Sequence, residues 1–228
     1  MIPRVLHRIW LGNRPRPAFY DDYWQQWAAL HPGWDLHTWT ERSIPPLRNQ
    51  AEYDPCAPAA GDGILADDEL AAVVQRSHIA AYELVWRFGG VYVDCAMQPL
   101  RPLDELLDFP ALAGLGDDRY MCNAVLGGEP RSPFFDAVIS ELPFRVATNP
   151  HAGVEVQTGP HLLTAIWREH PELIAVLPRE AFLCAHHGSA TTQVETARRA
   201  GAFAIHHWLH RARGRDLGVL ASRGSHAR

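Results

Sequence analysis

A single carboxylate, Asp94, occupies the position in this chain that is best placed to do chemistry. It directly follows Val91-Tyr92-Val93, a β-branched and aromatic run typical of a buried strand, and that run follows the double glycine Gly89-Gly90. In open α/β sheets, ligands bind at the edge formed by the carboxyl ends of the strands. An acid held there can fix a divalent metal ion against the phosphates of a substrate. The alternative is an acid that faces solvent or caps a local turn, with no hollow beside it.

Several kinds of catalytic site are excluded by residues that are absent. The chain contains no lysine, so a phosphate-binding site must use arginine, metal or backbone N–H groups. It also contains no nucleophilic-serine elbow, no dinucleotide-binding glycine fingerprint and no paired Cys–His signature. The four cysteines form no C-x-x-C pair, which favours free thiols in a reducing compartment. No residue is therefore assigned as a catalytic nucleophile.

Composition is that of an ordinary globular enzyme. A chain of 228 residues with 47% apolar content can bury one core, which predicts one domain. The net charge of −5 argues against general nucleic-acid binding, and we expect no specific nucleic-acid partner. No apolar run approaches the roughly 18 residues of a membrane span, and no secretory leader is evident. A cytoplasmic location is the expectation.

Hydrophobic periodicity predicts an α/β order for the elements that must hold Asp94. Strands are predicted near residues 4–11, 35–40, 91–93, 111–115, 124–126 and 203–206. Helices are predicted near residues 18–30, 67–88, 103–107, 133–142 and 160–169, with loop and broken helix over 45–63. The alternation predicts a mostly parallel sheet flanked by helices on both faces.

The segment around Asp94 also carries the motif of a known family. Its positions are Ser77, His78, Ala81, Tyr82, Val85, Trp86, Gly89, Gly90, Tyr92, Asp94 and Ala96. Further matching blocks lie at 2–12, 31–40, 123–134, 158–160 and 204–208. Together they resemble the glycosyltransferases with a DXD sugar-binding region, which include Och1-like mannosyltransferases and bacterial capsular-polysaccharide transferases. The blocks occur in the family's order, so their joint match is specific.

This resemblance implies a single GT-A-like, Rossmann-like domain over residues 1–210. It implies transfer of a sugar from a nucleotide-sugar donor to a glycan or lipid-linked acceptor, with retention of configuration and a divalent cation, Mn²⁺ or Mg²⁺, at the donor diphosphate. The implied metal ligands are Asp94 and His206. The implied substrate-binding residues are Leu6, His7, Trp10, His78, Gly90, Tyr92, Asp94, Asn123, Gly127 and Gly128.

Three positions depart from the family's pattern. His78 stands where the family has Asp, Ala81 where it has Arg, and Ala96 where it has the second acid of the DXD motif. Alanine cannot bind a phosphate or a hydroxyl, and histidine does not reproduce a carboxylate acceptor. The alternative function is therefore a catalytically impaired nucleotide- or sugar-binding protein on the same scaffold. The neighbouring polar residues Tyr82 and Glu83 are expected at a surface or interface.

The C-terminal part of the chain is basic. Residues 198–228 contain seven arginines and one acid, Asp216. We expect residues 211–228 to form a flexible, solvated tail. The alternative interpretation is peripheral contact with an anionic membrane surface or a polyanionic acceptor.

Overall fold

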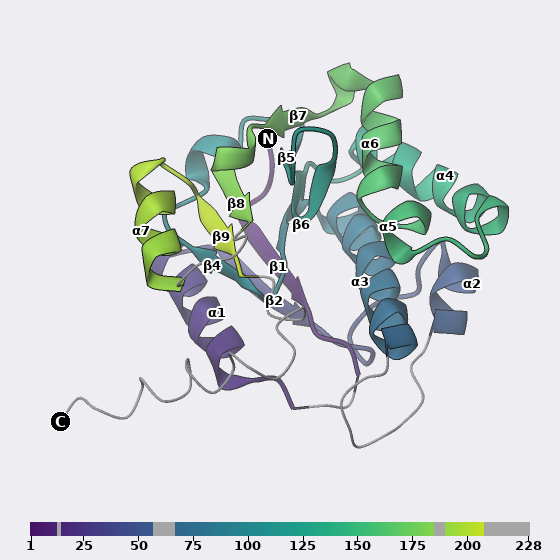
Figure 1. Cartoon of the computed structure of the whole chain (residues 1–228), viewed down its shortest axis with the longest axis horizontal. Helices are drawn as coiled ribbons and strands as arrows, with labels where there is room; N and C mark the ends of the chain where they lie inside the picture. Colours follow the sequence, from purple (N-terminus) through teal and green to yellow (C-terminus); the bar gives the residue numbers. More distant parts are fainter. Residues whose placement is uncertain (13–14, 57–66, 185–189, 208–228) are drawn as a thin grey trace.

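A six-stranded sheet lies at the centre of the computed structural model, which describes residues 1–12, 15–56, 67–184 and 190–207 (Figure 1). Its strand order is β2-β1-β3-β6-β5-β7. The strands are β1 (Val5–Ile9), β2 (Asp35–Trp39), β3 (Gly90–Val93), β5 (Ala111–Leu115), β6 (Met121–Gly128) and β7 (Ala175–Leu177). All of these run in one direction except β6, which is antiparallel to both neighbours. The predicted mostly parallel sheet is confirmed.

Helices cover both faces of this sheet (Figure 1). One face is covered by α3 (Asp67–Phe88), α4 (Pro133–Thr148) and α6 (Pro160–Glu169). The other carries α1 (Ala18–Leu30), α7 (Ala190–Arg199) and a small sheet of β4 (Met97–Pro99), β9 (Ala204–His206) and β8 (Phe182–Cys184). Short helices are α2 (Gln50–Tyr53) and α5 (Val154–Gln157), with 3₁₀ turns at Asp54–Cys56, Asp104–Leu106, Pro171–Leu173 and Arg179–Ala181.

Strand β3 is buried along its whole length and separates two parts of the core. Val91 and Val93 pack on the α1 side with Trp27, whereas Tyr92 packs on the α3 side with Val85. A strand covered on both faces needs apolar side chains at every position, which explains the uninterrupted run before Asp94. The core therefore fixes the strand that carries this carboxylate.

The double glycine lets β3 lie directly against β1. Gly89 and Gly90 have φ of 68° and 93°, in the left-handed region that favours glycine. A Cβ at Gly90 would lie 2.6 Å from the carbonyl oxygen of Val5 on β1. The Nε2–H of His7 donates to the carbonyl of Gly89 at 2.7 Å. The turn is thus fixed both by close backbone packing and by a buried hydrogen bond.

Helix α4 continues past the end predicted near residue 142 and reaches Thr148. The predicted end lies directly before Pro143, a residue type that usually interrupts a helix, and the prediction was wrong. Pro143 has no N–H to donate to the carbonyl of Ile139, one turn earlier. That carbonyl accepts instead from the side-chain amide of Asn49 at 2.9 Å. The helix tolerates the proline because a distant side chain replaces the lost hydrogen bond.

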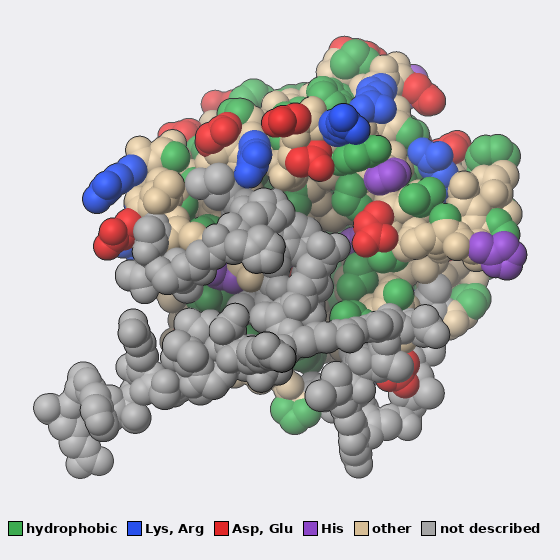
Figure 2. Space-filling view, in the orientation of Figure 1, with side chains coloured by type: hydrophobic (Ala, Val, Ile, Leu, Met, Phe, Trp, Pro, Cys, Tyr) green, Lys and Arg blue, Asp and Glu red, His purple; other side chains and the backbone are tan. Residues whose placement is uncertain are grey.

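Other boundaries agree closely with the prediction, including α1 and α3 at both ends. Strands β4, β7 and β8 and helices α5 and α7 were not predicted. The basic segment 211–228 lies outside the described residues. Within the described part of the chain, no helix is both long enough and apolar enough to cross a membrane. On the described part of the face in Figure 2, acidic and basic side chains are interspersed.

Candidate active site at the carboxyl edge of the sheet

Four segments meet at the edge where the parallel strands end. Strands β1 and β3 lead into Trp10 and Asp94 at this edge. Strand β6 runs the opposite way, so its first residues lie here, and the N–H of Asp94 donates to the carbonyl of Ala124 at 2.8 Å. Helix α3 runs back toward β3, which places its first half at the same edge (Figure 1). This is the expected ligand edge of an open α/β sheet.

Asp94 both caps its own turn and pairs with a distant histidine. Its Oδ1 accepts the N–H of Ala96 at 2.8 Å and lies 3.1 Å from Nε2 of His206. An ionised carboxylate can only accept, so Nε2 of His206 carries the proton. Pairing of β4 with β9 brings the two together, since Met97 lies opposite His206. The Asp94 side chain remains 39% exposed, and that of His206 is 4% exposed.

A narrow surface crevice, with no internal space for a water molecule, lies beside Asp94. Its lining is Arg8, Tyr20, Tyr23, Trp24, Trp27, Val93, Asp94, Cys95 and Met97. Asp94 is therefore a local cap and also part of the wall of a small hollow. A second depression, with a cavity volume of about 30 Å³, lies at the other end of α3, near Pro45 and Trp86, and contains none of the predicted site residues. Trp24 and Trp27 of α1 pack in the core, and together with Tyr20 and Tyr23 they form one side of the crevice.

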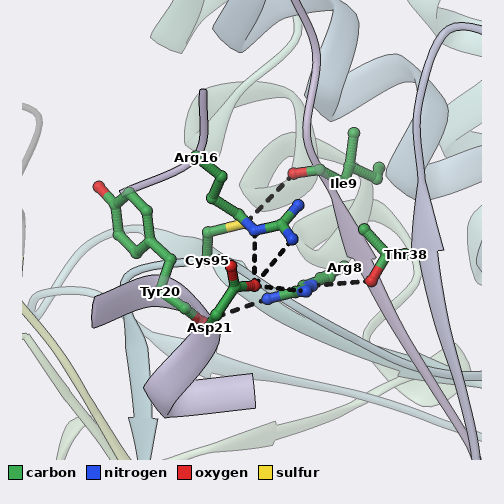
Figure 3. Close-up of polar contacts among 7 residues, drawn as sticks. All are labelled: Arg8, Ile9, Arg16, Tyr20, Asp21, Thr38 and Cys95. Atoms are coloured by element: carbon green, nitrogen blue, oxygen red, sulfur yellow. Dashed lines mark hydrogen bonds and ion pairs between the residues drawn. The ribbon is translucent and has the colours of Figure 1, made fainter. Parts of the chain in front are cut away.

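Two arginines share one carboxylate beside the crevice (Figure 3). Asp21 accepts from Arg8 at 2.9 Å and from Arg16 at 2.8 Å. Arg8 is nearly buried, also donates to Thr38 at 2.8 Å, and lies over the ring of Trp24. Two guanidiniums against one carboxylate give this cluster one excess positive charge, which balances the carboxylate of Asp94 on the same crevice. Arginine is also the side chain that this lysine-free chain has for contacting a phosphate.

The thiol of Cys95 is protonated and hydrogen-bonded, so it is not available as a nucleophile. It donates to the carbonyl of Ile9 at 3.3 Å, as Figure 3 shows. Burial, reinforced by the negative charge of Asp94, raises the pKa of this thiol to about 12. A protonated, hydrogen-bonded thiol is a poor nucleophile. Cys95 is therefore not a candidate for a catalytic nucleophile.

A buried polar network connects α3 with β6 and the segment before α6. His78 donates through Nδ1 to the hydroxyl of Thr158 at 3.3 Å, because that hydroxyl itself donates to the carbonyl of Val154. The Tyr82 hydroxyl donates to the carbonyl of Thr158 at 2.6 Å, and the Asn123 amide donates to the Tyr82 oxygen. Burial lowers the pKa of His78 to about 4, although the charges of Asp94 and Glu155 oppose this shift. His78 is therefore neutral near pH 7.

Five of the predicted substrate-binding residues lie away from this edge. Gly127 and Gly128 pair with Val91 and Gly90 at the beginning of β3, and Leu6 is fully buried between the strands. A Cβ at Gly128 would lie 2.8 Å from the Phe135 ring, so this glycine serves close packing. His7 is fully buried, and its Nδ1 accepts from Trp39 at 3.1 Å. This placement corrects the expectation that Leu6, His7, Gly90, Gly127 and Gly128 line the pocket; they position β3.

The other predicted residues lie at or near the edge. Trp10 follows β1, with its ring 5.6 Å from that of Tyr20. Tyr92 is buried just before Asp94, and burial raises its pKa well above the ordinary value. Asn123 lies next to Ala124, whose carbonyl accepts from Asp94. His78, Asn123, Asp94 and His206 thus meet at one end of the sheet.

The described residues do not form a pre-built metal site. Across the described part of the chain, no three His, Cys, Asp or Glu side chains are grouped closely enough to hold an ion. Ala96 is buried and supplies no second acid. One carboxylate and one imidazole fit a cation only if a diphosphate and water complete its coordination, as is common for Mg²⁺. These two side chains would suit a cation that binds together with the substrate.

Sequence reasoning missed two parts of the site. Tyr82 was expected, with Glu83, at a surface or interface; both are buried, and Tyr82 belongs to the polar network of the site. His78 and Tyr82 are four residues apart, so they share one face of α3 and both reach Thr158. That spacing was the available signal. The Arg8–Asp21–Arg16 cluster had no comparable signal, because its members come from a strand, a loop and a helix.

A family model described as "Glycosyltransferase sugar-binding region containing DXD motif" matches residues 17–112. Inositol phosphoceramide mannosyltransferase 3 of Schizosaccharomyces pombe is 28% identical over 169 residues, which cover 73% of this chain and 45% of the relative. Mannosyl phosphorylinositol ceramide synthase SUR1 of Saccharomyces cerevisiae is 26% identical over 172 residues, which cover 75% and 43%. The chain thus spans less than half the length of these curated relatives.

Solved glycosyltransferases share the fold. PaToxG glycosyltransferase superposes with a TM-score of 0.58 at 14% identity, covering 88% of this chain and 78% of that structure. The UDP-bound glycosyltransferase domain of the YGT toxin superposes with a TM-score of 0.52 at 9% identity, covering 77% and 79%. The comparisons confirm the resemblance to DXD-region glycosyltransferases and the GT-A-like fold, and they support an enzyme.

Proposed function

We propose that this chain transfers a sugar from a nucleotide-sugar donor to a glycan or lipid-linked acceptor, with retention of configuration. The observation that carries the proposal is Asp94, which lies with His206 at the ligand edge of a GT-A-like sheet. The two yeast relatives are named for mannosyl transfer to inositol phosphoceramide, which supports a hexose donor and a lipid-linked acceptor. The YGT toxin domain was solved with UDP bound, which supports a nucleotide-linked donor for this chain.

In this proposal the chain's main task is to hold the leaving diphosphate. A bound Mn²⁺ or Mg²⁺ would neutralise the charge that develops on the diphosphate as the glycosidic bond breaks. Asp94 would hold that cation, and His206 would join it only by releasing the Nε2 proton that it donates to Asp94. Arg8 and Arg16 add positive potential beside the crevice while Asp21 fixes their geometry. The buried Cys95 thiol stays protonated and takes no part.

Titration with UDP and GDP, with and without Mn²⁺, tests the role of Asp94. The informative variant is Asp94→Asn, because asparagine keeps an oxygen for the Ala96 N–H and removes only the charge. We expect Mn²⁺-dependent nucleotide affinity to fall by about tenfold or more, the scale of one charge-assisted contact. Asp117→Asn is the matched control, since Asp117 also caps a turn, accepting from Arg119 and Tyr120 at 2.8 Å, and does not line the crevice.

The second candidate function is a binding protein that has lost turnover. It is favoured by Ala96, which removes the second acid, and by the non-polar Ala81. This alternative predicts metal-independent nucleotide binding that Asp94→Asn leaves unchanged, and no donor hydrolysis across a panel of nucleotide-sugars. Turnover with any donor contradicts it. An NMR assay of the product's anomeric configuration then tests retention.

Residues 211–228 extend the proposal to a membrane surface on the cytoplasmic side. This segment contains five arginines and one acid, a composition that attracts anionic lipid. We expect the full chain to sediment with vesicles containing phosphatidylserine and a variant of residues 1–210 to remain in solution. Equal sedimentation of both would assign any membrane contact to another part of the chain.

A further inference from the structure

We infer that Arg16 binds a phosphate of the donor directly, by leaving Asp21 when the nucleotide arrives. The inference rests on the proposed function and adds to it a diphosphate contact that needs no cation. Arg16 lies in the connection between β1 and α1, between the family-like blocks 2–12 and 31–40. In the structure the Asp21 carboxylate holds this arginine, so Asp21 is the partner that a phosphate replaces.

The two arginines that share Asp21 are held very differently. The Arg8 side chain is 5% exposed, and it also donates to the Thr38 hydroxyl at 2.8 Å and to the carbonyl of Tyr20 at 3.2 Å. The Arg16 side chain is 22% exposed, and Asp21 is its only partner among the described residues. Arg8 is therefore fixed, and Arg16 is the member of this cluster that can turn to a ligand.

All the contacts between these side chains fall on one oxygen of Asp21 (Figure 3). Nη2 of Arg8 donates to Oδ1 at 2.9 Å, Nε of Arg16 donates to it at 2.8 Å, and Nη2 of Arg16 lies 2.7 Å from it. If Arg16 leaves, the carboxylate keeps the buried guanidinium of Arg8 as its partner. Because a partly exposed ion pair contributes little to stability, Asp21 competes only weakly with a phosphate for Arg16.

The cluster lies at the edge where the donor diphosphate is proposed to bind. Arg8 lines the crevice together with Asp94 and Cys95. Burial raises the pKa of the Cys95 thiol, and the charges of Arg8 and Arg16 oppose that shift, which places both guanidiniums near the residue that follows Asp94. Arg16 therefore lies beside the carboxylate that carries the proposed function.

Charge identifies the ligand of Arg16 as a phosphate. The two acids Asp21 and Asp94 balance Arg8 and Arg16, so a bound diphosphate brings negative charge that these four side chains do not compensate. A guanidinium presents paired N–H groups that match the oxygens of a phosphate. The contact should therefore strengthen with each phosphate on the nucleoside and be absent for the bare nucleoside.

Titration in EDTA separates this contact from any bound cation. The probes are uridine, UMP and UDP, and the matching guanosine series, titrated into the full chain by calorimetry. The wild-type chain should keep measurable affinity for UDP or GDP in EDTA, and Mn²⁺ should raise that affinity through Asp94. Arg16→Gln should weaken diphosphate binding in EDTA about tenfold, weaken monophosphate binding less, and leave nucleoside binding unchanged.

Asp21→Asn should have the opposite effect. Removing the competing carboxylate should raise diphosphate affinity about threefold, because Arg16 no longer has to leave a partner. In the Arg16→Gln background the same substitution should bring no gain. An ion pair with only a structural role would instead lose affinity in both single variants. Should Asp21→Asn fail to fold, since it leaves Arg8 buried without its carboxylate, the Arg16→Gln titrations still test the contact.

Arg4→Gln is the matched control, because Arg4 pairs with Asp104 at 3.1 Å and does not line the crevice. It should leave the affinity for every probe unchanged. If the wild-type chain binds no nucleotide with or without Mn²⁺, the proposed function fails and this inference with it. Binding that requires Mn²⁺, or full diphosphate affinity in Arg16→Gln, overturns the inference alone. So does an equal loss for nucleoside and diphosphate, which indicates a general packing defect.

Discussion

His7 shows how one buried side chain holds the strand that carries Asp94. Its Nε2–H donates to Gly89 and its Nδ1 accepts from Trp39, so both nitrogens are satisfied in a single neutral tautomer. Burial lowers the pKa of His7 to about 4, despite the opposing effect of the Gly89 carbonyl. The residue therefore fixes the double-glycine turn, and the turn fixes the register of β3 on β1.

His7→Phe should destabilise the fold by about 2–4 kcal/mol, because it leaves the Gly89 carbonyl and the Trp39 N–H buried without partners. His37→Phe is the control: His37 stacks on His7 but lies exposed on the edge strand β2, so a change below about 1 kcal/mol is expected. Urea unfolding measures both. Normal stability of His7→Phe with lost nucleotide binding would instead give His7 a substrate contact.

At the scale of single residues, sequence reasoning located the acid but not its surroundings. The position of Asp94 follows from an apolar run and a double glycine, both visible in the chain. The depth of Tyr82 depends on which face of α3 meets β6, and a polar hydroxyl within an amphipathic helix does not reveal that. The placement of Gly127 and Gly128 depends on β6 running antiparallel, which reverses the end of the strand that faces the ligand.

At the scale of elements, two glycines with similar backbones allow a direct comparison. Gly90 and Gly12 have φ of 93° and 91°, but only Gly90 is closely packed, since an added Cβ would meet the Val5 carbonyl at 2.6 Å. Gly12 has nothing within 4 Å of such an atom.

Gly90→Ala should therefore destabilise by about 3 kcal/mol or more, and Gly12→Ala by about 1 kcal/mol from backbone strain alone. Thermal and urea unfolding of the two variants check the difference. Equal effects would show that the approach of β3 to β1 can relax around a side chain.

Long elements were predictable and short ones were not. The helices at 18–30 and 67–88 have enough turns for their apolar spacing to define both ends. Strands of three residues, such as β7 and β8, contain too few positions to show alternation, and they form only because a partner strand is present. Helix α4 exceeded its predicted end because Asn49, far away in sequence, satisfies Ile139.

For the whole molecule, one buried histidine and two partly buried ones make stability depend on pH. Burial lowers the pKa of His7, His78 and His207 from 6.5 to about 4 in each case. Between about pH 6.5 and pH 4, these histidines bind protons in the unfolded chain but not in the folded chain. Stability is therefore fully present above about pH 6.5 and is lost as the pH falls toward 4.

We expect the free energy of unfolding, measured in urea from pH 7.5 to 4.5, to decline steadily below pH 6.5. His7 alone contributes on the order of 3 kcal/mol across the full window. His7→Phe should show a shallower decline than the wild-type chain, although it is less stable at neutral pH. An identical pH dependence of the two proteins would mean that His7 is not held neutral in the fold.

The pairing of Asp94 with His206 joins positions 112 residues apart. During synthesis, the strand carrying Asp94 leaves the ribosome long before the histidine that completes the edge. A chain that stops before residue 206 lacks the imidazole that pairs with this carboxylate, so the ligand edge is complete only when nearly the whole described sequence is present.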